Sequence, residues 1–231
     1  MWDNKLKAVT FSFDDGVTQD IRMIELLNRY GLKATFNLNS GLLGEIKQDT
    51  FRDEVFTVRK VSPDEVSQVY KDHEVAVHTI HHPRLTEIED ENEIVRQVEQ
   101  DRLTLQNLAS KDVVGMAYPC GGVNNDKRVA DIIKNRTGVK YSRTIKSTYT
   151  FDLQEDLFRF DPTLNFTEDN VLSVAEEFLK TESEAPQLLY IWGHSYEGDY
   201  FKIWERTERL FDMLSGHGDI YYATNREVFG I

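Results

Sequence analysis

The chain has 231 residues, of which 40% are hydrophobic and 29% are charged, and this is the composition of an ordinary globular domain. Its 27 Lys and Arg against 40 Asp and Glu leave a formal net charge of -13, which repels phosphate backbones and anionic lipids, so we expect no nucleic-acid partner. The single cysteine, Cys120, excludes an intramolecular disulfide, and no stretch approaches the ~18 consecutive apolar residues that membrane insertion requires.

Short β-rich runs alternate with longer segments of helical periodicity, a pattern typical of βα units and a mainly parallel sheet. The longest helix is expected from Glu87 to Leu108, with Thr86 as its N-cap. No linker or repeat interrupts the chain, so we predict that residues 1–231 form a single α/β domain whose strands come close to a full barrel. The seven predicted strands are Ala8–Phe13, Ala34–Asn39, Glu74–His78, Val113–Tyr118, Lys140–Thr144, Leu188–Gly193 and Ile220–Thr224.

The first strand ends in two adjacent carboxylates, Asp14 and Asp15, followed by Gly16. Sites in α/β folds form where strands end, so polar residues there attract attention. Adjacent carboxylates repel each other, and a divalent cation removes that conflict while leaving one carboxylate free as a base. Taken alone, such a triplet is more often a turn.

Three of the six histidines, His78, His81 and His82, follow the predicted strand that begins at Glu74. Imidazoles four positions apart can converge on one ion, and they favour zinc or its neighbours. A solvated polar loop is the alternative. We predict His78 and His82 as ligands, and His81 as a supporting or exposed residue.

An apolar strand delivers a further histidine, His194, to its carboxyl end. A lone histidine there is more often structural. Beside a metal and a carboxylate, however, it has the properties of a general acid, because its proton can be given up near neutral pH.

Together these motifs resemble the NodB-homology polysaccharide deacetylases, carbohydrate esterase family 4, over most of the chain. The segment FDDG at positions 13–16 is similar to the family's opening motif, which implies that Asp14 is the catalytic base and Asp15 a metal ligand. The segment HTIHHP at 78–83 is similar to the second motif, which implies that His78 and His82 complete the metal triad. The last motif implies that His194 is the general acid.

The third motif of this family departs from its usual arginine-containing pattern, because the segment AYPCGG at 117–122 has no arginine. Our hypothesis is that Arg143 takes over the missing role by pairing with Asp14. The backbone N–H of Cys120 should still donate to the oxyanion, since that contact needs no side chain. The substrate-binding residues implied by the resemblance are Trp192, Tyr118 and Pro119.

The fourth motif, in which an aspartate tunes the catalytic histidine, has no convincing equivalent. Asp161 is a candidate by position only, and a loop carboxylate before Pro162 is the favoured interpretation.

The resemblance implies a distorted (β/α) barrel with fewer than eight strands, and zinc in vivo, with cobalt or nickel as alternatives. It implies hydrolysis of N- or O-linked acetyl groups on a carbohydrate, with release of acetate. Two alternatives stay open: a hydrolase of a non-carbohydrate amide on the same fold, and an inactive carbohydrate-binding module. Cytoplasmic residence is the default, because the amino terminus lacks a secretory signal, although a trimmed signal is compatible with the sequence. The sugar and the oligomeric state are not indicated.

Overall fold

The computed structural model describes residues 2–231, and its centre is one sheet of parallel strands in the order β7-β6-β5-β2-β1-β9-β8, with β10 paired to β1. The α/β prediction is confirmed, and each predicted strand is present with slightly different bounds. The two-residue β8 was not predicted. The strands of this sheet are β1 (Lys7–Asp14), β2 (Ala34–Leu38), β5 (Glu74–Val77), β6 (Gly115–Ala117), β7 (Tyr141–Arg143), β8 (Leu164–Asn165), β9 (Gln187–Gly193) and β10 (Ile220–Tyr222).

The central strand β1 has one apolar and one polar face, and both are buried. Phe11 and Phe13 join the hydrophobic core, where the Phe11 ring lies 5.0 Å from that of Phe211. Thr10 and Ser12 alternate with them and bury their hydroxyls on the other side, where they form hydrogen bonds with polar side chains. The period of two along a strand therefore places Asp14 on the same polar interior face as Ser12.

The segment 160–165 closes the curled sheet. Phe160 bridges to Arg143 at the end of β7, while β8 pairs in parallel with β9. A single stretch of chain thus pairs with both β7 and β9, which gives the distorted (β/α) barrel that was expected.

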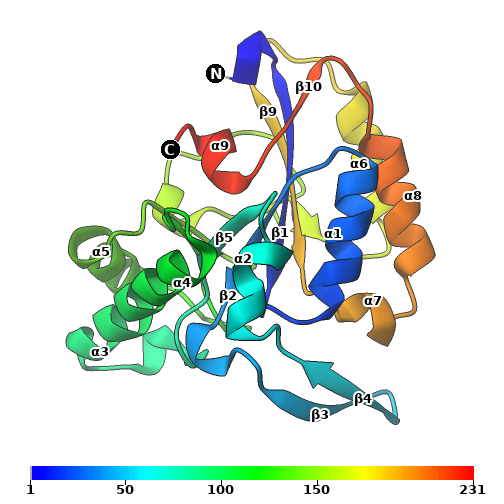
Figure 1. The fold of residues 1–231 in the computed structure, drawn as a ribbon. Helices are drawn as coiled ribbons and strands as arrows, with labels where there is room; N and C mark the ends of the chain where they lie inside the picture. The colour runs from blue at the N-terminus through cyan, green and yellow to red at the C-terminus, as the bar shows by residue number, and fades with distance from the viewer. Residues whose placement is uncertain (1) are drawn as a thin grey trace.

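Helices cover the outside of the sheet (Figure 1), with α1, α6 and α8 on one side and α3, α4 and α5 on the other. No helix among residues 2–231 is both long and apolar enough to span a bilayer. The helices are α1 (Gln19–Arg29), α2 (Val66–Val69), α3 (Glu91–Val95), α4 (Asp101–Ala109), α5 (Lys127–Arg136), α6 (Val171–Lys180), α7 (Glu197–Tyr200), α8 (Trp204–Leu214) and α9 (Asn225–Phe229).

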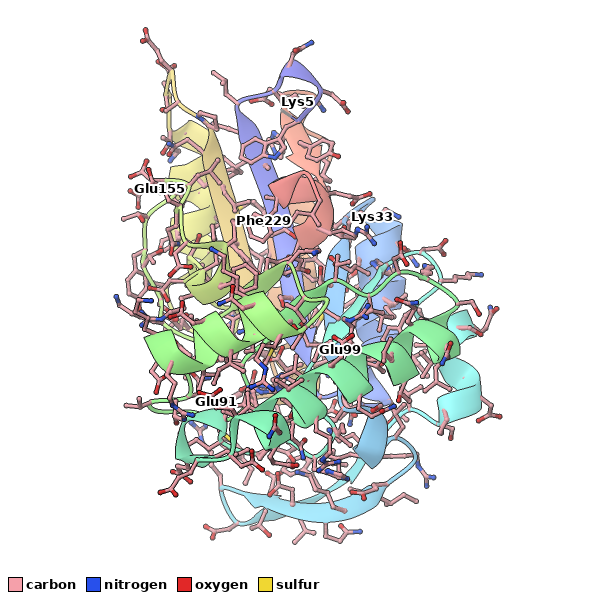
Figure 2. The ribbon with its side chains drawn as sticks, turned by 90° about the vertical axis from the view of Figure 1, so that its left-hand side faces the viewer. Lys5, Lys33, Glu91, Glu99, Glu155 and Phe229 are labelled. Carbon is pink, nitrogen blue, oxygen red and sulfur yellow. The ribbon has the colours of Figure 1, made fainter. Side chains whose placement is uncertain are left out.

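The predicted start of the longest helix is wrong. Asp90 is the N-cap, and its carboxylate accepts the N–H of Asn92 at 2.9 Å. Thr86 lies in a separate 3-10 turn and donates instead to the carbonyl of Val123. From Glu91 the helix continues through a π-helical stretch at 96–100 into α4, and Figure 2 shows it running past Glu99 across the outside of the molecule.

A hairpin of β3 (Ile46–Phe51) and β4 (Glu54–Arg59) extends from the barrel and was not predicted. Figure 1 shows it at the lower end of the molecule, toward which β1 runs. Its turn residues, Arg52 and Asp53, both have positive φ, as in a type I′ hairpin turn. Because β3 buries no residue fully, its sequence lacks the alternation that signals a strand.

Candidate active site

The carboxyl ends of β1, β5, β6 and β9 meet around a cavity of about 360 Å³. Two further predicted residues, Arg143 and Pro119, are buried and do not line the cavity. The predicted residues that line it are Asp14, Asp15, His78, His82, Tyr118, Cys120, Trp192 and His194.

The three predicted metal ligands converge in this cavity. One ligand atom each from Asp15, His78 and His82 lie within 4.8 Å of one another. The Nδ1 of His78 donates to the Ala117 carbonyl at 2.8 Å, so its Nε2 carries the free lone pair. Burial lowers the pKa of His78 to about 4 and also lowers that of His82. Both imidazoles are therefore neutral near pH 7, the form that binds a metal.

Left-handed backbone conformations gather around these ligands. The φ angles of Asp15, Thr79, His82 and Cys120 are 85°, 69°, 58° and 69°. Such angles are unfavourable for residues with a Cβ atom, and they persist where surrounding contacts enforce them, often at functional sites. These unfavourable backbone conformations therefore occur where side chains converge on the predicted metal site.

Lys60, which follows the hairpin, was missed by the sequence analysis. Its ammonium donates to the Asp15 carbonyl at 2.6 Å and lies 3.2 Å from the Asp15 carboxylate. Burial raises the pKa of Asp15, but Lys60, followed by His194, lowers it by more, so the pKa lies well below its ordinary value. Asp15 is therefore ionised whether or not a cation is bound.

The carboxylate of Asp14 is held by Arg143 and Asn37. Arg143 Nη2 lies 2.5 Å from each carboxylate oxygen, and Asn37 donates to Oδ1 at 2.8 Å. Burial raises the pKa of Asp14, whereas the Arg143 guanidinium, followed by His78, lowers it by more and brings it below 3.8. The expected pairing of Arg143 with Asp14 is thus present, although the two residues are 129 positions apart.

Arg143 reaches this position across the barrel interior. Its Nε donates to Ser12 at 3.2 Å, and its guanidinium lies 4.5 Å from the centre of the Trp192 ring. The side chain is only 1% exposed. Arg143 thereby holds Asp14 and the Trp192 ring in place together.

His194 lines the same cavity as the three predicted metal ligands. Its ring lies 5.8 Å from that of Trp192 and 5.1 Å from that of Tyr196. Burial lowers the pKa of His194, but the Glu197 carboxylate, followed by Asp15, raises it by more, to about 9. His194 therefore carries a proton at neutral pH, as a general acid must.

The loop after β6 lines a further side of the cavity. Tyr118 lines the cavity, and its hydroxyl donates to the Phe158 carbonyl at 2.8 Å. The Cys120 thiol lies 3.7 Å from Nδ1 of His82, and Asn124 donates to the Cys120 carbonyl at 2.8 Å. The loop is held in one shape by these contacts.

Asp161 lies in a different place. Its carboxylate accepts a hydrogen bond from Thr144, lies 3.5 Å from Lys146, and lines a neighbouring cavity. This is the loop role favoured from the sequence.

Several supporting residues were not found from sequence. Asp101 accepts the backbone N–H groups of Ser40 at 2.7 Å and of His78 at 3.2 Å, which anchors the start of the histidine loop. Asn37 lies one residue before the end of β2 and pairs with Asp14 at the end of β1, so the strand-end rule could have found it. Glu197 stands three positions after His194, a helical spacing that the sequence displays. No sequence signal points to Lys60.

A double variant, His78→Ala with His82→Ala, should lose zinc affinity by more than about 100-fold, because loss of two ligands exceeds the ~10–100-fold cost of changing a group that only orients a ligand. Equilibrium dialysis with metal analysis measures this. The matched control is His81→Ala, since His81 is exposed in the same loop and should leave affinity unchanged. Wild-type affinity in the double variant would remove the basis of the site.

Comparison with known proteins identifies the protein family that the sequence motifs resemble. The family model described as polysaccharide deacetylase matches residues 3–141. The chain therefore belongs to the polysaccharide deacetylase family. No curated protein matches it.

Solved structures share the fold at low identity. A Streptococcus pyogenes deacetylase, PplD, in complex with acetate is 17% identical with a TM-score of 0.52, and the match covers 65% of this chain and 62% of that one. Wild-type BA3943, a CE4 family pseudoenzyme from Bacillus anthracis, is 15% identical with a TM-score of 0.57, covering 97% and 65%. A family 4 acetyl xylan esterase from Clostridium thermocellum in complex with a cobalt ion is 13% identical with a TM-score of 0.57, covering 97% and 91%. The chain thus spans less than two thirds of the first two, and at these identities the likeness is one of fold.

Proposed function

We propose that this protein is a divalent-metal-dependent deacetylase that hydrolyses an N- or O-linked acetyl group on a carbohydrate and releases acetate. One observation carries the proposal: an ionised carboxylate, Asp14, and a protonated imidazole, His194, line the same cavity as three convergent metal ligands.

The ligand set suits a first-row divalent ion, with zinc as the first choice. Two neutral imidazoles and one carboxylate converge, and the tautomer of His78 is fixed by the Ala117 carbonyl. This donor set is one that catalytic zinc accepts, and cobalt and nickel share its preference. When bound, such an ion polarises a carbonyl group and lowers the pKa of water.

Asp14 is the general base in this proposal. It lies beside the ligand His78, with 4.0 Å between its Oδ2 and the imidazole Nε2, so a water at the ligand cluster is within its reach. Arg143 and Asn37 hold the carboxylate and leave it only slight freedom to rotate. Asp14 then takes a proton from the attacking water.

His194 completes the reaction from the opposite wall. It gives its proton to the departing amine or alcohol, while the N–H of Cys120 donates to the oxyanion of the tetrahedral intermediate. The ring of Trp192 closes the acetyl end of the cavity. No covalent bond to the enzyme is required.

The carbohydrate part of the proposal is supported by family membership and by the acetyl xylan esterase among its structural relatives. Hydrolysis of a non-carbohydrate amide would use the same groups on a different substrate. One structural relative is a pseudoenzyme. An inactive binding module is disfavoured here because the proposed base, ligands and acid all line one cavity.

The test is acetate release from a panel of N- and O-acetylated sugars and oligosaccharides. Metal-stripped protein should release none, and zinc- or cobalt-loaded protein should release acetate from at least one member. If loaded protein binds metal and releases nothing, the carbohydrate proposal is wrong, and a panel of non-carbohydrate amides separates the two alternatives.

A further inference from the structure

A carboxylate that no sequence motif identified lies beside the Nδ1 atom of His194. Glu197 Oε2 lies 3.3 Å from Nδ1 of His194, and the same oxygen accepts the His194 backbone N–H at 2.9 Å. The Nδ1 atom is buried and makes no hydrogen bond among residues 2–231, so its contact with Glu197 is an ion pair. Glu197 is therefore the anion in direct reach of this nitrogen.

The turn that joins the two residues is built around this contact. Glu197 donates its own backbone N–H to the His194 carbonyl at 3.0 Å. A Cβ atom at Gly193 would lie 2.2 Å from the Phe166 ring and 3.2 Å from the Glu197 carboxylate, so only glycine fits before His194.

Ser195, between them, is tied to the rest of the barrel. Its hydroxyl donates to Asp20 of α1 at 2.5 Å, and Asp20 also accepts the Tyr70 hydroxyl at 2.7 Å. All three side chains are buried. The turn is thereby prevented from moving Glu197 away from the histidine.

We infer that Glu197 is a positioning residue for His194: it binds the Nδ1–H side of the imidazolium, so that the Nε2–H is the proton presented to the cavity. A carboxylate in this place fixes the ring orientation and stabilises the charged form. The effect on turnover rests on the proposed function, whereas the contact itself does not. The groups that face His194 are Glu197, Tyr196 and Trp192 from its own turn and strand, Asp14 at the end of β1, and Asp15 directly after it.

The test is an NMR titration of the His194 ring in zinc-loaded protein, with the resonance assigned by its loss in His194→Ala. Wild type should have a higher His194 pKa than Glu197→Gln, because the Glu197 carboxylate 3.3 Å from Nδ1 favours the protonated imidazole. Glu197→Gln keeps the size and an acceptor for the backbone N–H but removes the charge, so it should lower the pKa by about 1–3 units. Glu197→Asp should restore part of the shift.

Asp161→Asn is the matched control, since it removes one negative charge from the other candidate carboxylate and should leave the titration unchanged. An unchanged pKa in Glu197→Gln, or a lowered one in Asp161→Asn, would overturn the inference.

The pH-rate profile gives the catalytic readout. The acid must be protonated, so activity falls as pH rises through the pKa of His194, and this alkaline limb should move to lower pH in Glu197→Gln by the same amount as the titration. A titration shift in a protein that releases no acetate from any substrate would support the role of Glu197 and refute the deacetylase proposal separately.

Discussion

Replacing Asp14 with asparagine should reduce turnover by a factor of about 10²–10⁴ and leave zinc on the protein. An amide cannot take a proton from water, while the cluster of Asp15, His78 and His82 is unchanged. Acetate release under saturating substrate measures the first effect, and metal analysis of the dialysed variant measures the second. Asp161→Asn, the same chemical change in the neighbouring cavity, is the control and should retain wild-type turnover.

The same substitution should also destabilise the fold, because Arg143 keeps its charge while it loses its counter-charge. Both partners are almost fully buried, at 1% and 2% exposure. Leaving one member of a buried ion pair unpaired costs about 3–5 kcal/mol. Kinetics must therefore be recorded well below the melting temperature, where circular dichroism shows the variant folded. Full turnover by a folded, zinc-loaded Asp14→Asn protein would exclude Asp14 as the base.

Replacing Arg143 with alanine should give the second large effect, a loss of both stability and turnover. Asp14 is then a buried carboxylate without its main counter-charge, so its pKa rises. The base must be ionised, so the acid limb of the pH-rate profile should move to higher pH. Arg143→Lys should recover little, since lysine lacks the planar fork that contacts Asp14, Ser12 and Trp192 together.

The sign of the stability effect follows from the direction of the pKa shift. In the wild type the pKa of Asp14 lies below its unfolded value of 3.8, so the carboxylate stabilises the fold at pH values above about 4 and loses this contribution as pH falls further. In Arg143→Ala the contribution is missing at neutral pH. Denaturant unfolding at pH 7 should show a loss of about 3–5 kcal/mol. If stability, turnover and the pH-rate profile all match the wild type, Arg143 has no part in steadying the base.

The sequence by itself determined the strands and the residues at their ends. The run from Leu188 to Gly193 is buried on both faces, and its continuous apolar character predicts a strand. Parallel strands carry their carboxyl ends to one edge, so the sequence predicts that Asp15, His78 and His194 share one site. The start of the longest helix was predicted wrongly. Asp90 rather than Thr86 is the N-cap, because the backbone becomes helical only after Asp90.

Only the tertiary structure decided which side chains meet across the barrel. The hairpin at 46–59 buries too little apolar surface to show a pattern, yet it brings Lys60 against Asp15. Glu197 was visible as a spacing, but its contact with Nδ1 of His194 depends on a turn that Ser195 anchors to a distant helix. The pairing of Arg143 with Asp14 was a hypothesis until the closed sheet brought together residues 129 positions apart. Such contacts depend on the curvature of the whole sheet, and sequence periodicity describes only the local conformation of each strand and helix.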